Sequence, residues 1–363
     1  RIGLTMASPI SSTSNTGRVS SLDVAKQAGV GQMTVSRVFS GKGYVSQKTR
    51  EKVLEVARKL NYRPNLAAAA MNSGRFGCVT LLCSTNATRS LLPQNTLMGL
   101  DGVLNEQDMH MVFSQLADDD LANPHQIPKA LRVSMSDGLL INYNAHIPES
   151  LIHQIHQHHI PAVWINAKLA ESCVYPDEEQ AGYMAAKHLL DMGHRLIAFL
   201  CSGWPDAEGI VRPTLEHFSV VDRQAGYARA MTQADLKPRH IVVQTQRDSD
   251  LHVRTLTELL GQPDLPTAML VNSQAMAGSL CLHAMQLGIK VPSQLSVMCF
   301  EKEFQPSGSI AMDAITTPDT VIGQLAGRMI LDRIQNPNAA VDPCAVSCSL
   351  KAGHTCVPPS SSI

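Results

Sequence analysis

Residues 20–64 constrain the fold most, because they are patterned for three short helices around one small core. Ser20 followed by Asp23 is typical of a capping box at a helix start, and Gly29 stands where a left-handed residue ends a helix. A second helix is predicted over residues 32–39, and a third follows it. Two helices joined by a tight glycine-containing turn, with a third helix closing the core, predict a helix-turn-helix domain.

The same region carries a concentration of positive charge. Residues 18–75 hold 11 Lys and Arg against 3 acidic residues, a net charge of +8, whereas the whole chain has a net charge of −1. Such asymmetry indicates a polyanionic partner, because neutralising phosphates releases counterions and supplies affinity that is independent of sequence. We therefore expect this domain to bind double-stranded DNA. The alternative is a small three-helix domain without a partner.

In a helix-turn-helix domain the second helix enters the major groove and its first residues reach base edges. Gln32 can bond an adenine through two hydrogen bonds, Arg37 can do so with a guanine, and Met33 can pack against a thymine methyl group. Thr34 and Ser36 carry short hydroxyl groups that suit phosphate oxygens. The sequence therefore predicts a base-reading helix.

The chain resembles the LacI/GalR family of bacterial transcription regulators. In the first domain the matching segments stand in register: DVA (23–25), AGV (28–30), TVSRV (34–38), VS (45–46), TR (49–50) and NYRPN (61–65). Further matches run through the rest of the chain, such as DGLLIN (137–142), DRQAGY (222–227) and AITTP (314–318). The resemblance implies a homodimer on a near-palindromic operator. One departure is Gly31, where the family usually has Ser, a stronger helix cap.

The resemblance also implies a hinge helix over residues 64–74, which orders on DNA and places an apolar side chain in the minor groove. Met71 occupies that position, and Tyr62 and Asn65 fall among the residues expected to bind DNA. Two arginines that are usual in the family hinge are missing, while the four consecutive alanines at 67–70 favour a helix. We expect this hinge to be partly helical even without DNA; a plain alanine-rich spacer is the alternative.

About 290 residues follow Gly74, too many for one ordinary core. Short aliphatic runs alternate there with amphipathic segments, which predicts two lobes, each a doubly wound parallel sheet. The family resemblance implies a fold similar to periplasmic sugar-binding proteins. The expected divisions are a disordered tail (1–17), the helix-turn-helix domain (18–63), the hinge (64–74), lobe 1 (75–175 with 311–336), lobe 2 (176–310 with 342–357) and a tail (358–363).

Ligands of such sheets bind at the carboxyl ends of the strands, where two lobes form a cleft. The residues expected to line it, the first three by resemblance, are Arg223, Asn272, Glu301 and Asn142. Their side chains suit hydroxyl groups or a carboxylate. Ser273 and Lys302 stand where the family usually has acids. Two interpretations therefore stay open: a repressor controlled by a small-molecule effector such as a sugar or related metabolite, or a constitutive DNA-binding regulator with a degenerate pocket.

Nothing in the sequence points to catalysis. It has no GxSxG motif, no phosphate-binding glycine loop and no metal quartet, and the histidines at 153–159 favour a solvated helix face. Nine scattered cysteines without a CxxC pair fit a reducing cytoplasm, and no apolar run is long enough to span a membrane. We expect a cytoplasmic, nucleoid-associated protein that is not an enzyme and has no cofactor, metal site or membrane contact. The segment 204–221 predicts either a lid over the cleft or a solvated loop.

Overall fold

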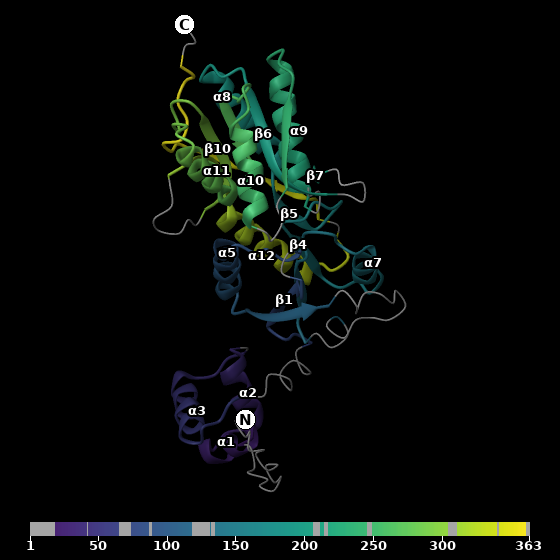
Figure 1. Ribbon diagram of the computed structural model, residues 1–363. Coiled ribbons are helices and arrows are strands. Elements are labelled where there is room, and N and C mark those ends of the chain that lie inside the picture. Colours follow the sequence, from purple (N-terminus) through teal and green to yellow (C-terminus); the bar gives the residue numbers. More distant parts are fainter. Residues whose placement is uncertain are drawn as a thin grey trace, which may run out of the picture. The chain divides into compact units, whose positions relative to one another are not determined.

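The computed structural model describes residues 19–41, 43–64, 74–86, 89–117, 131, 135–205, 211–213, 217–244, 249–303, 311–339 and 341–360. The chain forms two compact units, residues 1–76 and residues 77–363 (Figure 1). No helix within the described ranges is both long enough and apolar enough to cross a membrane.

The N-terminal unit contains three helices, α1 (Ser21–Ala28), α2 (Gln32–Ser40) and α3 (Gln47–Lys59). The predicted capping box is present: the Ser20 hydroxyl accepts the Asp23 amide, and the Asp23 carboxylate accepts the Ser20 amide. Gly29 ends α1 in the left-handed conformation, with φ of 66°. The core of this unit consists of small aliphatic side chains, namely Val24, Ala25, Ala28, Val35, Val38, Val53 and Ala57.

The C-terminal unit is built on two sheets (Figure 1). The first, in the order β12-β5-β4-β3-β1-β2, comprises β1 (Cys78–Ser84), β2 (His110–Leu116), β3 (Gly138–Asn142), β4 (Ala162–Ile165), β5 (Cys173–Pro176) and β12 (Cys344–Val346). The second, in the order β13-β11-β10-β9-β6-β7 with β8 also paired to β6, comprises β6 (Ile197–Pro205), β7 (Val211–Pro213), β8 (Arg239–Gln244), β9 (Ala268–Val271), β10 (Ser296–Lys302), β11 (Asp313–Thr317) and β13 (Ser349–Lys351). All described pairings are parallel except those of β7 and β13.

Helices cover both sheets, and we call each sheet with its helices a lobe. Lobe 1 carries α5 (Gln94–Glu106), α7 (Glu149–Gln157) and α12 (Asp319–Gln335); lobe 2 carries α8 (Glu178–Asp191), α9 (Phe218–Gln233), α10 (Ser249–Leu260) and α11 (Gln274–Gln286). The central strands β1 and β9 are mostly apolar, and every residue in them is buried. Such continuous runs are expected when helices cover both faces of a parallel sheet.

The predicted lobe boundaries are wrong in two places. We expected residues 311–336 in lobe 1, but β11 pairs with β10 in the second sheet, so only α12 returns to lobe 1. We expected residues 342–357 in lobe 2, but β12 pairs with β5 in the first sheet while β13 pairs with β11. Strands this short carry too little pattern to choose a sheet, and each of the two sheets offers an edge strand that can accept them.

Candidate DNA-reading helix and effector cleft

Helix α2 separates an apolar face from an exposed one. Val35 and Val38 are buried in the domain core, whereas Gln32, Met33, Ser36 and Arg37 are exposed and Thr34 is half-buried. The Met33 side chain is 69% exposed, and its sulfur accepts a hydrogen bond from Arg37 Nη2 at 3.6 Å. A thioether and a guanidinium group therefore stand together on the exposed face. This pairing presents one apolar and one doubly donating group to whatever the helix contacts.

The N-terminus of α2 lacks a side-chain cap. Gly31 has φ of −71° and ψ of 149°, and no side chain accepts the first-turn amides. A Cβ atom at Gly31 would lie 4.0 Å from Thr34 Oγ1, so the backbone and the space both admit a serine. Gln32 instead turns back to α1, where its Nε2 donates to Ser21 Oγ at 2.9 Å.

The other predicted DNA-binding residues differ in their surroundings. Tyr62 packs within the domain, its ring edge-to-face with Phe39 at 5.4 Å between centroids. Asn65 and Met71 lie outside the described residues, as do all positions of the expected hinge from 65 to 73. Sequence reasoning missed Tyr44, which lies between α2 and α3 and is 90% exposed. Its signal was an aromatic residue in a glycine-containing turn, away from the apolar spacing of either helix.

The C-terminal unit holds a cavity of about 680 Å³ lined by both lobes, which we call the cleft. Three of the four predicted residues, Arg223, Asn272 and Glu301, meet there. Asn142 is not among its lining residues: it is fully buried beside Cys83, and its Oδ1 accepts from Asn144 Nδ2 at 2.9 Å. Asn144, two residues further on, lines the cleft instead.

Arg223 is held by a carboxylate that sequence reasoning missed. Its Nε lies 2.6 Å from Glu178 Oε2 and its Nη2 lies 2.7 Å from Glu178 Oε1, while Nη1 donates to the Asn272 carbonyl at 2.9 Å. The guanidinium carbon lies 4.2 Å above the Phe300 ring. Most of the Arg223 donors are therefore used within the protein. Arg223 thus forms part of the cleft wall and holds Asn272 in place, and it offers few free N–H groups to a ligand.

The ion pair depends on close contact between α8 and α9. A Cβ atom at Gly182 on α8 would collide with the Arg223 carbonyl, and one at Gly226 on α9 would collide with the Glu179 carbonyl. Only glycine permits the two backbones to approach this closely. The two helices therefore bring Glu178, at the first position of α8, beside Arg223.

The carboxylate of Glu301 has only one of its two oxygens hydrogen-bonded among the described residues. Its Oε1 accepts from Lys351 Nζ at 2.7 Å and from Thr316 Oγ1 at 3.3 Å. Its Oε2 is buried and has no hydrogen-bond partner among the described residues. Because buried polar atoms in folded proteins nearly always have partners, this oxygen is suited to a donor from a bound molecule or water.

Polar contacts join the two lobes around the cleft. His217, just before α9, donates from Nε2 to the Asn166 carbonyl of lobe 1 at 3.1 Å and accepts the Ser219 amide on Nδ1 at 3.2 Å. Burial lowers the pKa of His217, which favours this neutral form. Lys168 of lobe 1 forms an ion pair with Asp222 of lobe 2 at 2.7 Å. The segment 204–221 thus contributes His217 to the cleft, whereas residues 206–210 and 214–216 lie outside the described ranges.

Glu303 makes a further contact between the lobes, two residues after Glu301. Its Oε2 accepts from Asn95 Nδ2 at the start of α5, at 3.0 Å, and from the Thr320 amide at the start of α12, at 2.8 Å. Burial opposes ionisation, but these hydrogen bonds outweigh it and lower the pKa of Glu303. The ionised carboxylate therefore ties the end of β10 to two helices of lobe 1.

Comparison with known families identifies both units. The model for bacterial regulatory proteins of the lacI family matches residues 22–65, and the model for the periplasmic binding protein-like domain matches residues 186–356. The HTH-type transcriptional repressor PurR of Escherichia coli O139:H28 is 28% identical over 326 residues, which cover 86% of this chain and 90% of that protein. PurR of Shigella dysenteriae serotype 1 is 27% identical over the same coverage.

Solved structures share the fold. The Lac repressor dimer bound to operator and the anti-inducer ONPF superposes with a TM-score of 0.74 at 23% identity, over 93% of this chain and 98% of that chain. The complex of the transcriptional regulator CelR with cellobiose gives a TM-score of 0.60 at 22% identity, over 93% of this chain and 100% of that chain.

Proposed function

Because the chain belongs to the LacI family of bacterial regulatory proteins, we propose that it is a sequence-specific DNA-binding repressor of transcription controlled by a small molecule in the cleft. The observation that carries the DNA-binding role is the exposed face of α2, with Met33 and Arg37 in contact, within the basic domain. Arg37 can donate two hydrogen bonds to a guanine, and Met33 can contact a thymine methyl group. Tyr44, an exposed aromatic residue in the turn after α2, belongs to the same proposed interface.

The cleft favours a functional effector site over a degenerate one. Ser273 and Lys302 replace the family's usual acids, yet Glu301 keeps a buried carboxylate oxygen without a partner among the described residues. A degenerate pocket would gain stability by satisfying or replacing that group. The effector is therefore a molecule that donates a hydrogen bond to Glu301, such as a sugar hydroxyl or an N–H group of a related metabolite.

Switching requires that the effector bind one arrangement of the lobes better than another. Glu301 lies at the end of β10, and Glu303 follows two residues later. A ligand that binds Glu301 and moves it therefore also displaces the contacts of Glu303 with α5 and α12. The His217 contact with Asn166 is the second connection to change. We propose that these movements alter the linker at 64–74 and so the affinity for the operator.

We propose that the protein acts as a homodimer on a near-palindromic operator, as twofold protein symmetry requires. The support is exposed apolar surface on the C-terminal unit: Val112 and Phe113 on the edge strand β2, Met98 on α5 and Met285 on α11. Exposed hydrophobic edge strands are avoided in monomers, and a second copy would cover this one. The Lac repressor with the same fold is a dimer.

Its relatives are repressors, and we propose the same class here, with no catalytic activity and no cofactor. Among the described residues, no group of three or more His, Cys, Asp or Glu is arranged to hold a metal ion. The nine cysteines are free thiols, which fits work in the cytoplasm at nucleoid DNA.

The proposal is tested by selecting bound sites from random duplex DNA with the full chain, with and without fractionated metabolite pools. A regulator of this kind enriches a twofold-related site, and at least one pool changes its occupancy. Failure to enrich any duplex over random competitor at moderate salt would overturn the DNA-binding role. Enrichment that no pool alters, together with no thermal shift by sugars, nucleobases or organic acids, would favour the constitutive alternative.

A further inference from the structure

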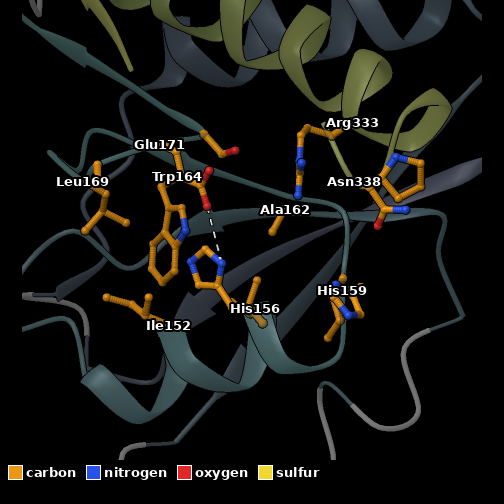
Figure 2. A pocket seen from close by; sticks show the side chains of 14 residues that line it. Ile152, His156, His159, Ala162, Trp164, Leu169, Glu171, Arg333 and Asn338 are labelled. Carbon is orange, nitrogen blue, oxygen red and sulfur yellow. Dashed lines mark ion pairs between the residues drawn. The ribbon is translucent and has the colours of Figure 1, made fainter. Parts of the chain in front are cut away.

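A second cavity, of about 970 Å³, lies within lobe 1 and shares no lining residue with the cleft. It is lined by α7, by β4 with the segment leading into β5, and by the C-terminal end of α12 (Figure 2). Small-molecule sites have volumes of about 300–1,000 Å³. We call it the lobe 1 pocket.

One wall of the lobe 1 pocket is apolar and partly aromatic. Ile152 of α7, Trp164 of β4 and Leu169 of the following segment line it, and Figure 2 shows these three side chains grouped on one side of the pocket. This wall suits a flat or apolar body. Aromatic groups pack well against an indole ring in offset or edge-to-face contacts.

Two residues that line the pocket have buried polar atoms without partners among the described residues. Ser172 is 6% exposed, and its Oγ has no hydrogen-bond partner in the described part of the chain. The same holds for Arg333 Nε, although Nη1 of that residue donates to the Ala339 carbonyl. Figure 2 shows the Arg333 side chain descending from α12 into the pocket. Two donors without a partner, one of them cationic, thus belong to residues that line the pocket.

The charge balance of the pocket decides the kind of ligand. Its one lining acid, Glu171, already faces His156, with 3.4 Å between Oε1 and Nδ1 (Figure 2). Arg333 forms no ion pair with any described carboxylate. The positive charge of its guanidinium group is therefore not neutralised within the described part of the pocket. A guanidinium group recognises a carboxylate through charge-assisted hydrogen bonds, which a neutral amide cannot match.

We propose that the lobe 1 pocket binds a small aromatic carboxylate, distinct from the effector of the cleft. Its ring packs against Trp164 and Ile152, and its carboxylate accepts hydrogen bonds from Arg333 and the Ser172 hydroxyl. The Ser172 and Arg333 side chains shift slightly toward the ligand as it enters, because both atoms are closed to water in the unliganded form.

The test is isothermal titration of the full chain with 2-naphthoate and with its neutral counterpart 2-naphthamide. The acid binds at one site per chain, and the amide binds about tenfold more weakly or less, as expected for loss of a charge-assisted contact. Arg333→Gln lowers the affinity for the acid by about tenfold and leaves that for the amide unchanged. Arg328→Gln, an exposed arginine on the same helix, is the matched control and binds like the wild type.

Three results would overturn the proposal: no saturable binding of 2-naphthoate up to about 1 mM, equal affinity for the acid and the amide, or wild-type affinity in Arg333→Gln. Circular dichroism and binding to duplex DNA report whether each variant is folded. Should Arg333→Gln fail to fold, Ser172→Ala and the comparison of acid with amide on the wild type decide the question. A weaker affinity of Ser172→Ala for the acid supports the site, and an unchanged one counts against it.

Discussion

Glu178 and Arg223 form a two-pronged ion pair in the wall of the cleft, with both side chains buried. The sequence did not point to Glu178. Its carboxylate nevertheless occupies two of the donor nitrogens of Arg223, the residue predicted to bind the ligand. Removing one charge of a buried pair leaves the other without compensation, and this is more costly than losing an exposed pair.

Replacement of Glu178 therefore destabilises the C-terminal unit. We expect Glu178→Gln to lower the free energy of unfolding by about 3 kcal/mol or more, measured by urea denaturation. The matched control is Glu179→Gln, which removes the neighbouring acid from an exposed pair with Arg229; its cost is at most about 1 kcal/mol. Equal effects of the two substitutions would contradict the structural role assigned to Glu178.

Arg37 is expected to read one base pair. Arg37→Ala should weaken binding to the selected operator by about 1–3 kcal/mol and relax the preference at a single position in each half-site. The measurement is a fluorescence anisotropy titration against the operator and against single-base variants of it. If the substitution weakened binding equally on every duplex, Arg37 would instead contact a phosphate group.

Gly31→Ser should supply the helix cap that α2 lacks. The backbone at Gly31 is already extended and a Cβ atom there meets nothing closer than 4.0 Å, so a serine hydroxyl can accept a first-turn amide without strain. We expect a gain of roughly a few tenths of a kcal/mol in the stability of the N-terminal unit and tighter DNA binding. Gly31→Ala, which adds the Cβ atom without the hydroxyl, is the control and should give neither gain.

The stability of the C-terminal unit should fall in mild acid because of three histidines whose pKa is lowered in the folded chain. Burial lowers the folded-state pKa of His217, His194 and His240 below their usual 6.5. Below that pH these histidines bind protons in the unfolded chain but stay largely neutral in the folded chain. The free energy of unfolding therefore decreases as the pH falls through 6.5. Burial raises the pKa of Asp319, which acts in the opposite direction at lower pH.

The pH dependence is measured by urea denaturation at a series of values between about pH 7.5 and 5.5. His217→Gln keeps a donor for the Asn166 carbonyl but cannot titrate, so its stability should change less with pH than that of the wild type. An identical slope in both proteins would show that His217 does not contribute.

Phe113 is expected to lie in the dimer interface. It is 61% exposed on the edge strand β2, where a charge would be buried without a partner in the dimer. Phe113→Glu should give a monomer in sedimentation analysis and weaken operator binding. Leu196→Glu alters a side chain that is 62% exposed and lies just before β6, outside the proposed interface, and this variant should remain a dimer. A dimeric Phe113→Glu would relocate the interface.

The sequence alone determined the N-terminal unit and the alternation of strands and helices in the core. The Ser20–Asp23 capping box, the left-handed Gly29 and the buried Val35 and Val38 depend on contacts within a few residues, which spacing and propensity describe well. Continuous aliphatic runs such as 78–83 predicted parallel strands for a similar reason, since both faces of each strand are covered.

Only the tertiary structure decided which groups meet in the cleft and the lobe 1 pocket. These features depend on residues far apart in the chain. They are the pairing of Glu178 with Arg223, the unpartnered oxygen of Glu301 and the distribution of β11 and β12 between the sheets. These contacts depend on how closely α8 approaches α9 and on which sheet edge is free, and neither leaves a periodic signal in the amino acids themselves.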